Sequence, residues 1–135
     1  MTRLKNKWIN CKKINLNKTI QIFEKKPNTD FRQFQKLDIR IGQILQVEKI
    51  PNYNSFFKLN IDIGFKKIIV VCNLNGIKNL KQIIGKKVCV LANIKPKKVK
   101  GQESQGLILL VKNNLGKIIF LEPDSQNIKI GLKVY

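Results

Sequence analysis

Residues 85–110 read GKKVCVLANIKPKKVKGQESQGLILL, with an apolar run at each end and a lysine-rich connection between them. The runs KKVCVLANI and GLILLVKN are rich in β-branched and aliphatic side chains, which favour strands. Pro96, Gly101 and Gly106 favour a break and sharp turns in the connection. We therefore predict two strands that are joined by a cationic loop.

Three further strands are predicted upstream of this stretch. In LDIRIGQILQVEKI, residues 37–50, apolar and polar side chains alternate, and Gly42 in the middle predicts a bulge or a sharp coil. FFKLNIDIG, residues 56–64, alternates in the same way. KKIIVVCNL, residues 66–74, is apolar enough for a largely buried strand.

The order of the predicted elements indicates the fold. In NGIKNLKQIIG, residues 75–85, apolar residues recur near helical spacing, and Gly85 is a plausible stop. KIIFLEP, residues 117–123, and IKIGLKVY, residues 128–135, form a last strand pair. Three strands, a short helix and then two strands is the order of the OB-fold. The chain is therefore predicted to be mainly all-β: a five-stranded OB-fold barrel with one short helix between strands three and four.

The first 30 residues differ from the rest, because they are rich in Lys and Asn and lack a clean hydrophobic period. KTIQIF within them could form a short strand. Pro27 marks a break, and Thr29 or Asp30 is placed to cap a helical turn in FRQFQKL. We predict a basic N-terminal extension, residues 1–30, and a barrel domain, residues 31–135.

Charge separates this chain from most domains of its length. It has 27 Lys and Arg against 8 Asp and Glu, a net charge of +19. A positive field of this size attracts phosphate backbones, so a nucleic-acid partner is predicted. A/T-rich codons would also raise the Lys, Asn and Ile content. They explain neither the scarcity of acids nor the clustering of lysines.

Several classes of catalytic site are excluded by composition. The chain contains no histidine, which removes His-based triads, His general bases and most zinc or iron sites. The acids are scattered, and no P-loop or G-x-G-x-x-G occurs. Ser104 in QESQG lacks the G-x-S-x-G spacing of a nucleophile. We predict no enzymatic activity, no metal and no cofactor.

Cysteine usage and hydropathy bear on location. Cys11, Cys72 and Cys89 are widely spaced without a C-x-x-C motif, which favours a reducing, intracellular setting. Cys72 and Cys89 lie in apolar runs and are predicted to be buried. No apolar run approaches the roughly 20 residues that span a bilayer, and no secretory signal is evident. A cytoplasmic location without membrane contact is predicted, and an organelle address is the weaker alternative.

The connection between the last two long strands holds the candidate binding residues. Asn93 continues an apolar row at the end of a strand, and two interpretations stay open: a solvated strand end, or an amide offered to a phosphate, ribose or base. Four lysines on a tight loop repel one another, and a bound phosphate chain would relieve this. Lysines that extend into water are the alternative. The candidates here are Asn93, Lys95, Lys97, Lys98, Lys100 and the hydroxyl of Ser104.

Three stretches carry a family resemblance. KLDIRIGQILQVEKIPN, KLNIDIG and GKKVCVLANIKPKKVKGQESQGLILL resemble the tRNA-binding domain family, from about Phe31 to Tyr135. The most specific string is N-x-K-P-x-K-x-x-G-x-x-S-x-G, from Asn93 to Gly106. The family includes free-standing tRNA-binding proteins, the C-terminal domain of many methionyl-tRNA synthetases, cytokine-like synthetase cofactors, the N-terminal module of the phenylalanyl-tRNA synthetase beta chain and a bacterial export chaperone.

The resemblance implies an OB-fold that grips the outside of tRNA at its elbow, largely by shape and backbone. The chain departs from the family at Cys72-Asn73, where Ser-Gly is usual, and at Leu107, where methionine is usual. The first departure leaves the shape of the adjoining groove open. The implied RNA-binding residues are Asn93, Lys95, Lys97, Lys98, Lys100 and Ser104, with Arg40 and Lys58 as additions from the first two strands.

The leading hypothesis is a non-catalytic tRNA-binding protein that works alone or as a trans-acting cofactor of an aminoacyl-tRNA synthetase. The alternative is a protein-binding module of the same fold, either a peptide-binding chaperone or a synthetase-complex assembly subunit. Such a module would use apolar groove residues such as Leu74 and Leu107. By resemblance, short family members tend to be homodimers, and pairing of terminal strands would cover an exposed edge.

Overall fold

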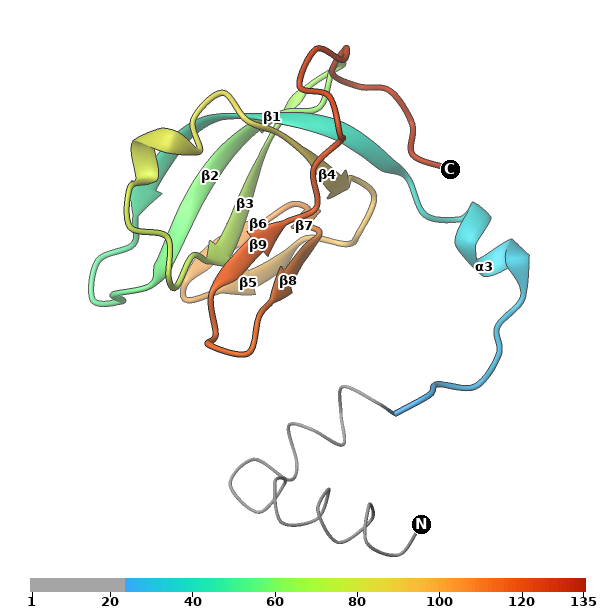
Figure 1. Ribbon diagram of the computed structural model, residues 1–135, viewed down its shortest axis with the longest axis horizontal. Coiled ribbons are helices and arrows are strands. Elements are labelled where there is room, and N and C mark those ends of the chain that lie inside the picture. Colours follow the sequence, from blue (N-terminus) through green and yellow to red (C-terminus); the bar gives the residue numbers. More distant parts are fainter. Residues whose placement is uncertain (1–23) are drawn as a thin grey trace, which may run out of the picture. The chain divides into compact units, whose positions relative to one another are not determined.

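An antiparallel sheet of five strands, in the order β3-β2-β1-β4-β7, forms the framework of the computed structural model (Figure 1). β1 pairs with β2 on one side and with β4 on the other, and β2 pairs with β3. This confirms the predicted all-β fold and its five-stranded, OB-like barrel. The strands span Ile39–Lys49 (β1), Phe56–Asp62 (β2), Lys67–Asn73 (β3), Lys87–Leu91 (β4) and Leu107–Ile108 (β7).

The structure describes residues 24–135, of which residues 32–135 form one compact unit. Residues 24–30 contain no helix or strand, and the predicted helical turn follows as α3, Phe31–Gln35. The rest of the predicted basic extension, with Cys11 and the strand expected in KTIQIF, lies outside the described residues. The extension and its boundary at residue 30 therefore stay predictions.

The alternating pattern of β2 is confirmed in the core. Phe57, Leu59 and Ile61 are at most 8% exposed, whereas Lys58 and Asn60 between them lie on the opposite face of the strand. Burying one large aliphatic or aromatic side chain contributes about 1.5–3 kcal/mol. The apolar row of β2 is thus one of the main contributions to the barrel's stability.

The strand irregularity in β1 falls at Leu45 and not at Gly42, so the predicted position is corrected. The register with β2 shifts between Ile44 and Gln46, which leaves Leu45 as the extra residue of a bulge. Gly42 is needed for a different reason. A Cβ at Gly42 would lie 2.8 Å from a methyl group of Ile61, because the barrel wall is tightly packed there.

Side-chain oxygens close the barrel between β3 and the chain just before β7. The Val71 N–H donates to Oγ of Ser104 at 3.0 Å, and the Ile69 N–H donates to Oε1 of Gln105 at 2.8 Å. The Gln105 N–H in turn donates to the Ile69 carbonyl at 2.7 Å. Two side-chain acceptors thus take the place of backbone carbonyls, and β3 is not left with an open edge at this point.

The short helix predicted between the third and fourth strands is present but shorter than residues 75–85. It is a single 3-10 turn, η1, Leu80–Gln82, capped by Asn79, whose side chain accepts the Lys81 N–H at 3.1 Å. Gly76 has a φ of +86° and lies in the turn after β3, so the helical turn begins later than predicted. Within residues 24–135, no helix has the length and apolar content needed to cross a membrane.

The predicted fifth strand is divided by Leu109 into β7 and β8, Leu110–Lys112. The Leu109 N–H donates to the Cys89 carbonyl, and the Leu109 carbonyl accepts the Leu121 N–H. One residue therefore links β4 to the following hairpin. In that hairpin β8 pairs with β9, Ile118–Phe120.

Residues 128–135 were predicted as a strand, and this is wrong. The segment does lie along β1: the Gly131 N–H donates to the Ile41 carbonyl at 2.7 Å, and the Val134 N–H donates to the Ile39 carbonyl at 2.8 Å. Gly131, however, has a φ of +88°, which interrupts extended geometry. The segment covers the edge of the barrel by hydrogen bonding without becoming a regular strand.

We predict that Gly106→Ala destabilises the barrel. A Cβ at Gly106 would lie 2.8 Å from Cδ1 of Ile68 and 3.0 Å from the carbonyl oxygen of Leu91. Overpacking of this kind lowers the free energy of unfolding by about 1–3 kcal/mol. Urea denaturation measures the loss, with the exposed Lys95→Ala as the control. A Gly106→Ala variant as stable as Lys95→Ala would contradict the proposed tight closure.

Candidate functional site

The cationic connection is itself folded, which the sequence did not predict. It contains a two-stranded hairpin of β5, Lys97–Val99, and β6, Gln102–Ser104. We call residues 95–104, which include this hairpin and Lys95 just before it, the lysine hairpin. Lys97 pairs with Ser104, and Lys98 pairs with Glu103. Successive strand residues point to opposite faces, so the hairpin presents amines on both of its faces.

The turn of the lysine hairpin has an unusual residue. Lys100 and Gly101 both have positive φ, +51° and +79°, as the two central residues of a type I′ turn require. Glycine adopts this conformation freely, but a lysine seldom does. A contact elsewhere in the protein must favour Lys100 at this position.

Two aromatic rings supply that contact. Nζ of Lys100 lies 4.9 Å from the ring centroid of Phe56 and 5.3 Å from that of Tyr53. The rings pack edge to face, with their centroids 6.2 Å apart. A cation–π contact contributes about 0.5–1 kcal/mol at an exposed site. The contact therefore holds the hairpin tip beside the loop between β1 and β2.

Ser104 is buried, and its hydroxyl is used within the protein. Its Oγ accepts the Val71 N–H at 3.0 Å and donates to the Gly106 carbonyl at 3.2 Å. The side chain is only 6% exposed. Ser104 thus roots the lysine hairpin on the barrel, and a direct ligand contact for it stays a prediction.

Asn93 also has both ends of its amide engaged. Oδ1 accepts the Asp38 N–H at 2.8 Å, and Nδ2 donates to the Lys36 carbonyl at 2.7 Å. These bonds tie the chain before β1 to the end of β4, although the residue is exposed to solvent. Asn93 therefore matches neither of its two interpretations completely: it is a solvated residue that acts as a clamp.

Arg40 lies apart from the lysine hairpin on the protein framework. Its Nε donates to the Asp38 carboxylate at 2.9 Å, its NH1 group donates to the Gly131 carbonyl at 2.9 Å, and its guanidinium lies 5.0 Å from the Phe65 ring. Arg40 is eight residues before Glu48 on β1, about 25 Å along an extended strand. Lys58 on β2 lies opposite Glu48 in the strand register. Arg40 and Lys58 therefore lie near opposite ends of β1.

Lys58 is close to the aromatic rings. It follows Phe56 by two residues on β2, so both side chains lie on the outer face of the strand. Beside Lys58 is a small polar hollow of about 90 Å³, which Asn60 also lines. Oδ1 of Asn60 is buried and has no hydrogen-bond partner among the described residues.

The exposed lysines at positions 95–98 form no ion pair with an acidic side chain in the described part of the chain. Lys95, Lys97 and Lys98 are exposed, and none forms an ion pair within residues 24–135. Glu103 faces Lys98 across the hairpin without reaching ion-pair distance. Nor does any group of His, Cys, Asp and Glu in the described part of the chain suit a metal ion. The chemistry that remains is electrostatic attraction and ring contact.

Cys72-Asn73, where the family usually has Ser-Gly, forms the end of β3. Cys72 packs against the core, and burial raises the pKa of its thiol to about 12. Asn73 uses its side chain to accept the Asn75 N–H at 2.8 Å, which shapes the turn after β3. Burial also raises the pKa of the Cys89 thiol. Both side chains are partly buried and not fully buried as predicted, and their raised pKa keeps the thiols protonated at neutral pH.

Sequence reasoning missed Tyr53, Phe56 and Asn60. The signal was present in PNYNSFF, where aromatic residues fall at the loop between strands one and two, a known ligand-binding region of OB-folds. The structure brings Lys100 into contact with Tyr53 and Phe56, and it places Lys58 and Asn60 beside one small hollow. Lys97 and Lys98 extend from the same hairpin, and Arg40 lies elsewhere.

Comparison with known proteins identifies related chains. The family model of the putative tRNA binding domain matches residues 39–131. A methionine–tRNA ligase of Flavobacterium johnsoniae is 40% identical over 119 residues, which covers 84% of this chain and 17% of the ligase. The ligase of Methanocaldococcus jannaschii is 35% identical over 111 residues, covering 82% of this chain and 17% of the ligase. The chain thus spans less than a fifth of the length of these ligases.

Two solved structures share the fold. The MetRS-related protein from Pyrococcus horikoshii matches with a TM-score of 0.73 at 27% identity, covering 82% of this chain and 100% of that one. The chaperone CsaA from Bacillus anthracis str. Ames matches with a TM-score of 0.71 at 26% identity, covering 81% and 100%. The barrel is therefore shared by proteins that carry different names.

We predict that Ser104→Ala lowers stability because the Val71 N–H loses its acceptor. Leaving a buried donor unsatisfied costs about 1–3 kcal/mol of unfolding free energy. The measurement is the urea midpoint, with Ser125→Ala as a control in an exposed loop. An unchanged midpoint for Ser104→Ala would show that the barrel closes without this hydroxyl.

Proposed function

The chain belongs to the tRNA-binding domain family, and on that basis we propose that it binds tRNA without catalysing a reaction. The observation that carries the proposal is the lysine hairpin, because it holds exposed and unpaired amines on a closed barrel. A rigid support lowers the entropy lost when the amines bind a folded polyanion. The scarcity of acids in the chain leaves this attraction largely unopposed.

Affinity in this proposal comes from lysine contacts to phosphates. Lys95, Lys97 and Lys98 would contact the RNA backbone and release condensed counterions. Ser104 and Asn93 would act indirectly, since their hydrogen bonds fix the position of the hairpin. Such contacts recognise the contour of a folded RNA more than its sequence.

The aromatic pair adds a second kind of contact. Tyr53 and Phe56 offer a ring surface on which an unpaired base can stack, worth about 1–3 kcal/mol per base. Lys100 lies over the same rings and would bind the adjoining phosphate. This surface favours RNA with unstacked nucleotides over a plain duplex.

We further propose that the protein acts in trans as a cofactor of an aminoacyl-tRNA synthetase. The ligases that it resembles contain a matching segment within one long chain. The Pyrococcus MetRS-related protein is matched over its whole length, so the barrel also occurs as a short chain elsewhere. A short chain of this kind would raise a synthetase's hold on tRNA by bringing a second grip to the same RNA.

A homodimer is part of the same proposal, and we predict that Val111→Lys dissociates it. Val111 lies opposite Ile119 across β8 and β9, and both side chains are nearly half exposed. A second copy that packs on this outer face would bury them. Sedimentation equilibrium should give twice the monomer mass for the wild type. The control is Leu115→Lys, in the exposed turn of the same hairpin. A monomeric wild type, or dissociation by both variants, would count against this interface.

We predict a steep salt dependence of tRNA binding. If about five phosphates are neutralised, the slope of log K against log salt should be roughly −3.5 to −4.5. The triple variant Lys95→Ala/Lys97→Ala/Lys98→Ala should flatten the slope by roughly 2 to 3 units. Filter binding of bulk tRNA at several salt concentrations measures both values.

The matched control has the same charge change on other exposed surfaces: Lys81→Ala/Lys112→Ala/Lys129→Ala. A salt-insensitive complex, or equal losses in the two triple variants, would contradict the role of the lysine hairpin. Lys100→Asn is a further variant, because Asn tolerates positive φ while the amine over the rings is lost. It should keep the fold and weaken RNA binding.

The second candidate is a protein-binding module, favoured by the structural match to CsaA chaperones. Of its two expected groove residues, Leu107 is exposed, but Leu74 is 2% exposed and belongs to the core. The leading proposal and this one separate in a single assay. The variant Lys95→Ala/Lys97→Ala/Lys98→Ala should lose tRNA binding. It should still bind an unfolded peptide if the two ligands use different surfaces.

A further inference from the structure

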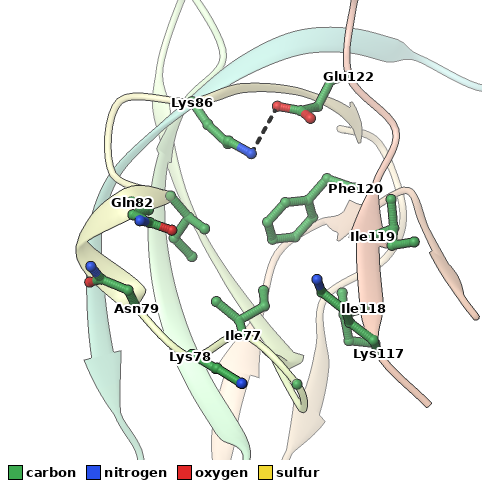
Figure 2. Close-up of a pocket in the computed structure, with 12 residues that line it drawn as sticks. Ile77, Lys78, Asn79, Gln82, Lys86, Lys117, Ile118, Ile119, Phe120 and Glu122 are labelled. Carbon is green, nitrogen blue, oxygen red and sulfur yellow. Dashed lines mark ion pairs between the residues drawn. The ribbon is translucent and has the colours of Figure 1, made fainter. Parts of the chain in front are cut away.

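An open hollow of about 750 Å³ lies between the segment that follows β3 and the hairpin of β8 and β9 (Figure 2). Its residues come from positions 76–86 and 117–122. None belongs to the lysine hairpin or to the face with Tyr53 and Phe56. It is therefore a surface that the proposed RNA contacts do not use.

The walls of the hollow are held in place by backbone contacts. The Ile118 N–H donates to the Asn75 carbonyl at 3.2 Å. At Gly76 a Cβ would come within 3.0 Å of Cα of Lys117, so the two walls meet closely at this end. The hollow is preformed, and a ligand would not have to open it.

The middle of the hollow is apolar. Figure 2 shows the Phe120 ring and the Ile77 side chain at its centre. Phe120 is almost buried and Ile77 is half-buried, so both rest on the core beneath. An apolar side chain seated there would lose water mainly against Ile77, with Phe120 as the floor beneath.

The rim of the hollow is cationic. Lys86 pairs with Glu122 at 3.3 Å and lies above Phe120 in the view of Figure 2. The amines of Lys78 and Lys117 lie below the ring in that view. Neither of these two lysines forms an ion pair within residues 24–135. The rim thus carries two positive charges that have no acidic partner among the described residues.

Charge decides among the occupants. A second copy of this chain would bring a net charge of +19 to a cationic rim, so the proposed dimer contact at Val111 and Ile119 would not extend across the hollow. Residues 1–23 contain six basic residues and no acid, so they are equally unsuited. A nucleic-acid backbone would match the lysines, but a base needs an open ring face on which to stack, and Phe120 is almost buried. Carboxylates beside an apolar side chain match both parts.

We propose that this hollow is a docking site for an acidic segment of a partner protein, which seats an apolar side chain against Ile77 and Phe120 and directs carboxylates to Lys78 and Lys117. The Lys86–Glu122 pair bounds the opposite end of the site. A partner held there would leave the lysine hairpin free for another ligand. The site shares no residue with the proposed RNA contacts, so the two proposals are tested separately.

The test uses the full chain and a short fluorescein-labelled peptide of glutamate and leucine with one phenylalanine, followed by fluorescence anisotropy. Lys78→Glu/Lys117→Glu should weaken binding at least about tenfold, or 1.4 kcal/mol. Lys95→Glu/Lys97→Glu is the matched control with the same charge change on the other surface, and it should stay within about twofold of the wild type. Circular dichroism and thermal melting check that both variants are folded.

A second peptide has serine in place of each leucine and phenylalanine, and it should bind at least about tenfold more weakly than the first. Equal weakening by the two double variants would show diffuse attraction and overturn the proposal. So would unchanged binding to Lys78→Glu/Lys117→Glu, or equal binding of the serine peptide. Bulk tRNA forms the last arm. If Lys78→Glu/Lys117→Glu abolishes tRNA binding and no variant responds to the peptide, the hollow is an RNA surface instead.

Discussion

Two side-chain hydrogen bonds, from Val71 to Ser104 and from Ile69 to Gln105, close the barrel together with one backbone bond, from Gln105 to Ile69. β3 would otherwise present unpaired N–H groups at this point, at a cost for each buried donor. Ser104 is also the last residue of β6, so one residue both closes the barrel and anchors the lysine hairpin. The base of the hairpin is therefore held by the same bonds that close the barrel.

This arrangement divides the residues of the N-x-K-P-x-K-x-x-G-x-x-S-x-G string by role. The polar residues, Asn93 and Ser104, have their hydrogen-bonding groups turned to the protein. Lys95, Lys97 and Lys98 have theirs turned to solvent. A short polar side chain reaches only nearby backbone, whereas a long cationic one extends past it. One short string can thereby build a support and the surface that it carries.

Two cationic surfaces with different neighbours follow from the same barrel. The lysine hairpin lies beside aromatic rings at Tyr53 and Phe56, which suits nucleotides. The hollow between positions 76–86 and 117–122 surrounds an apolar centre, which suits protein side chains. Net charge brings both kinds of anion to the molecule, and the groups beside the lysines discriminate between them. If both proposals hold, the domain would bind an RNA and a protein at the same time.

The sequence by itself determined the strands and the source of the charge, because burial of alternate residues such as Leu59 and Ile61 is written in a local period of two. The same local pattern also located the lysines of residues 95–100. Only the tertiary structure decided what the polar residues do. Ser104 meets Val71 across 33 positions of the chain, and Asn93 meets Asp38 across 55. The bulge at Leu45 and the ring contacts of Lys100 likewise depend on partners on other strands. A periodic pattern reports which side of a strand is buried, but it carries no information on which distant atom completes a hydrogen bond.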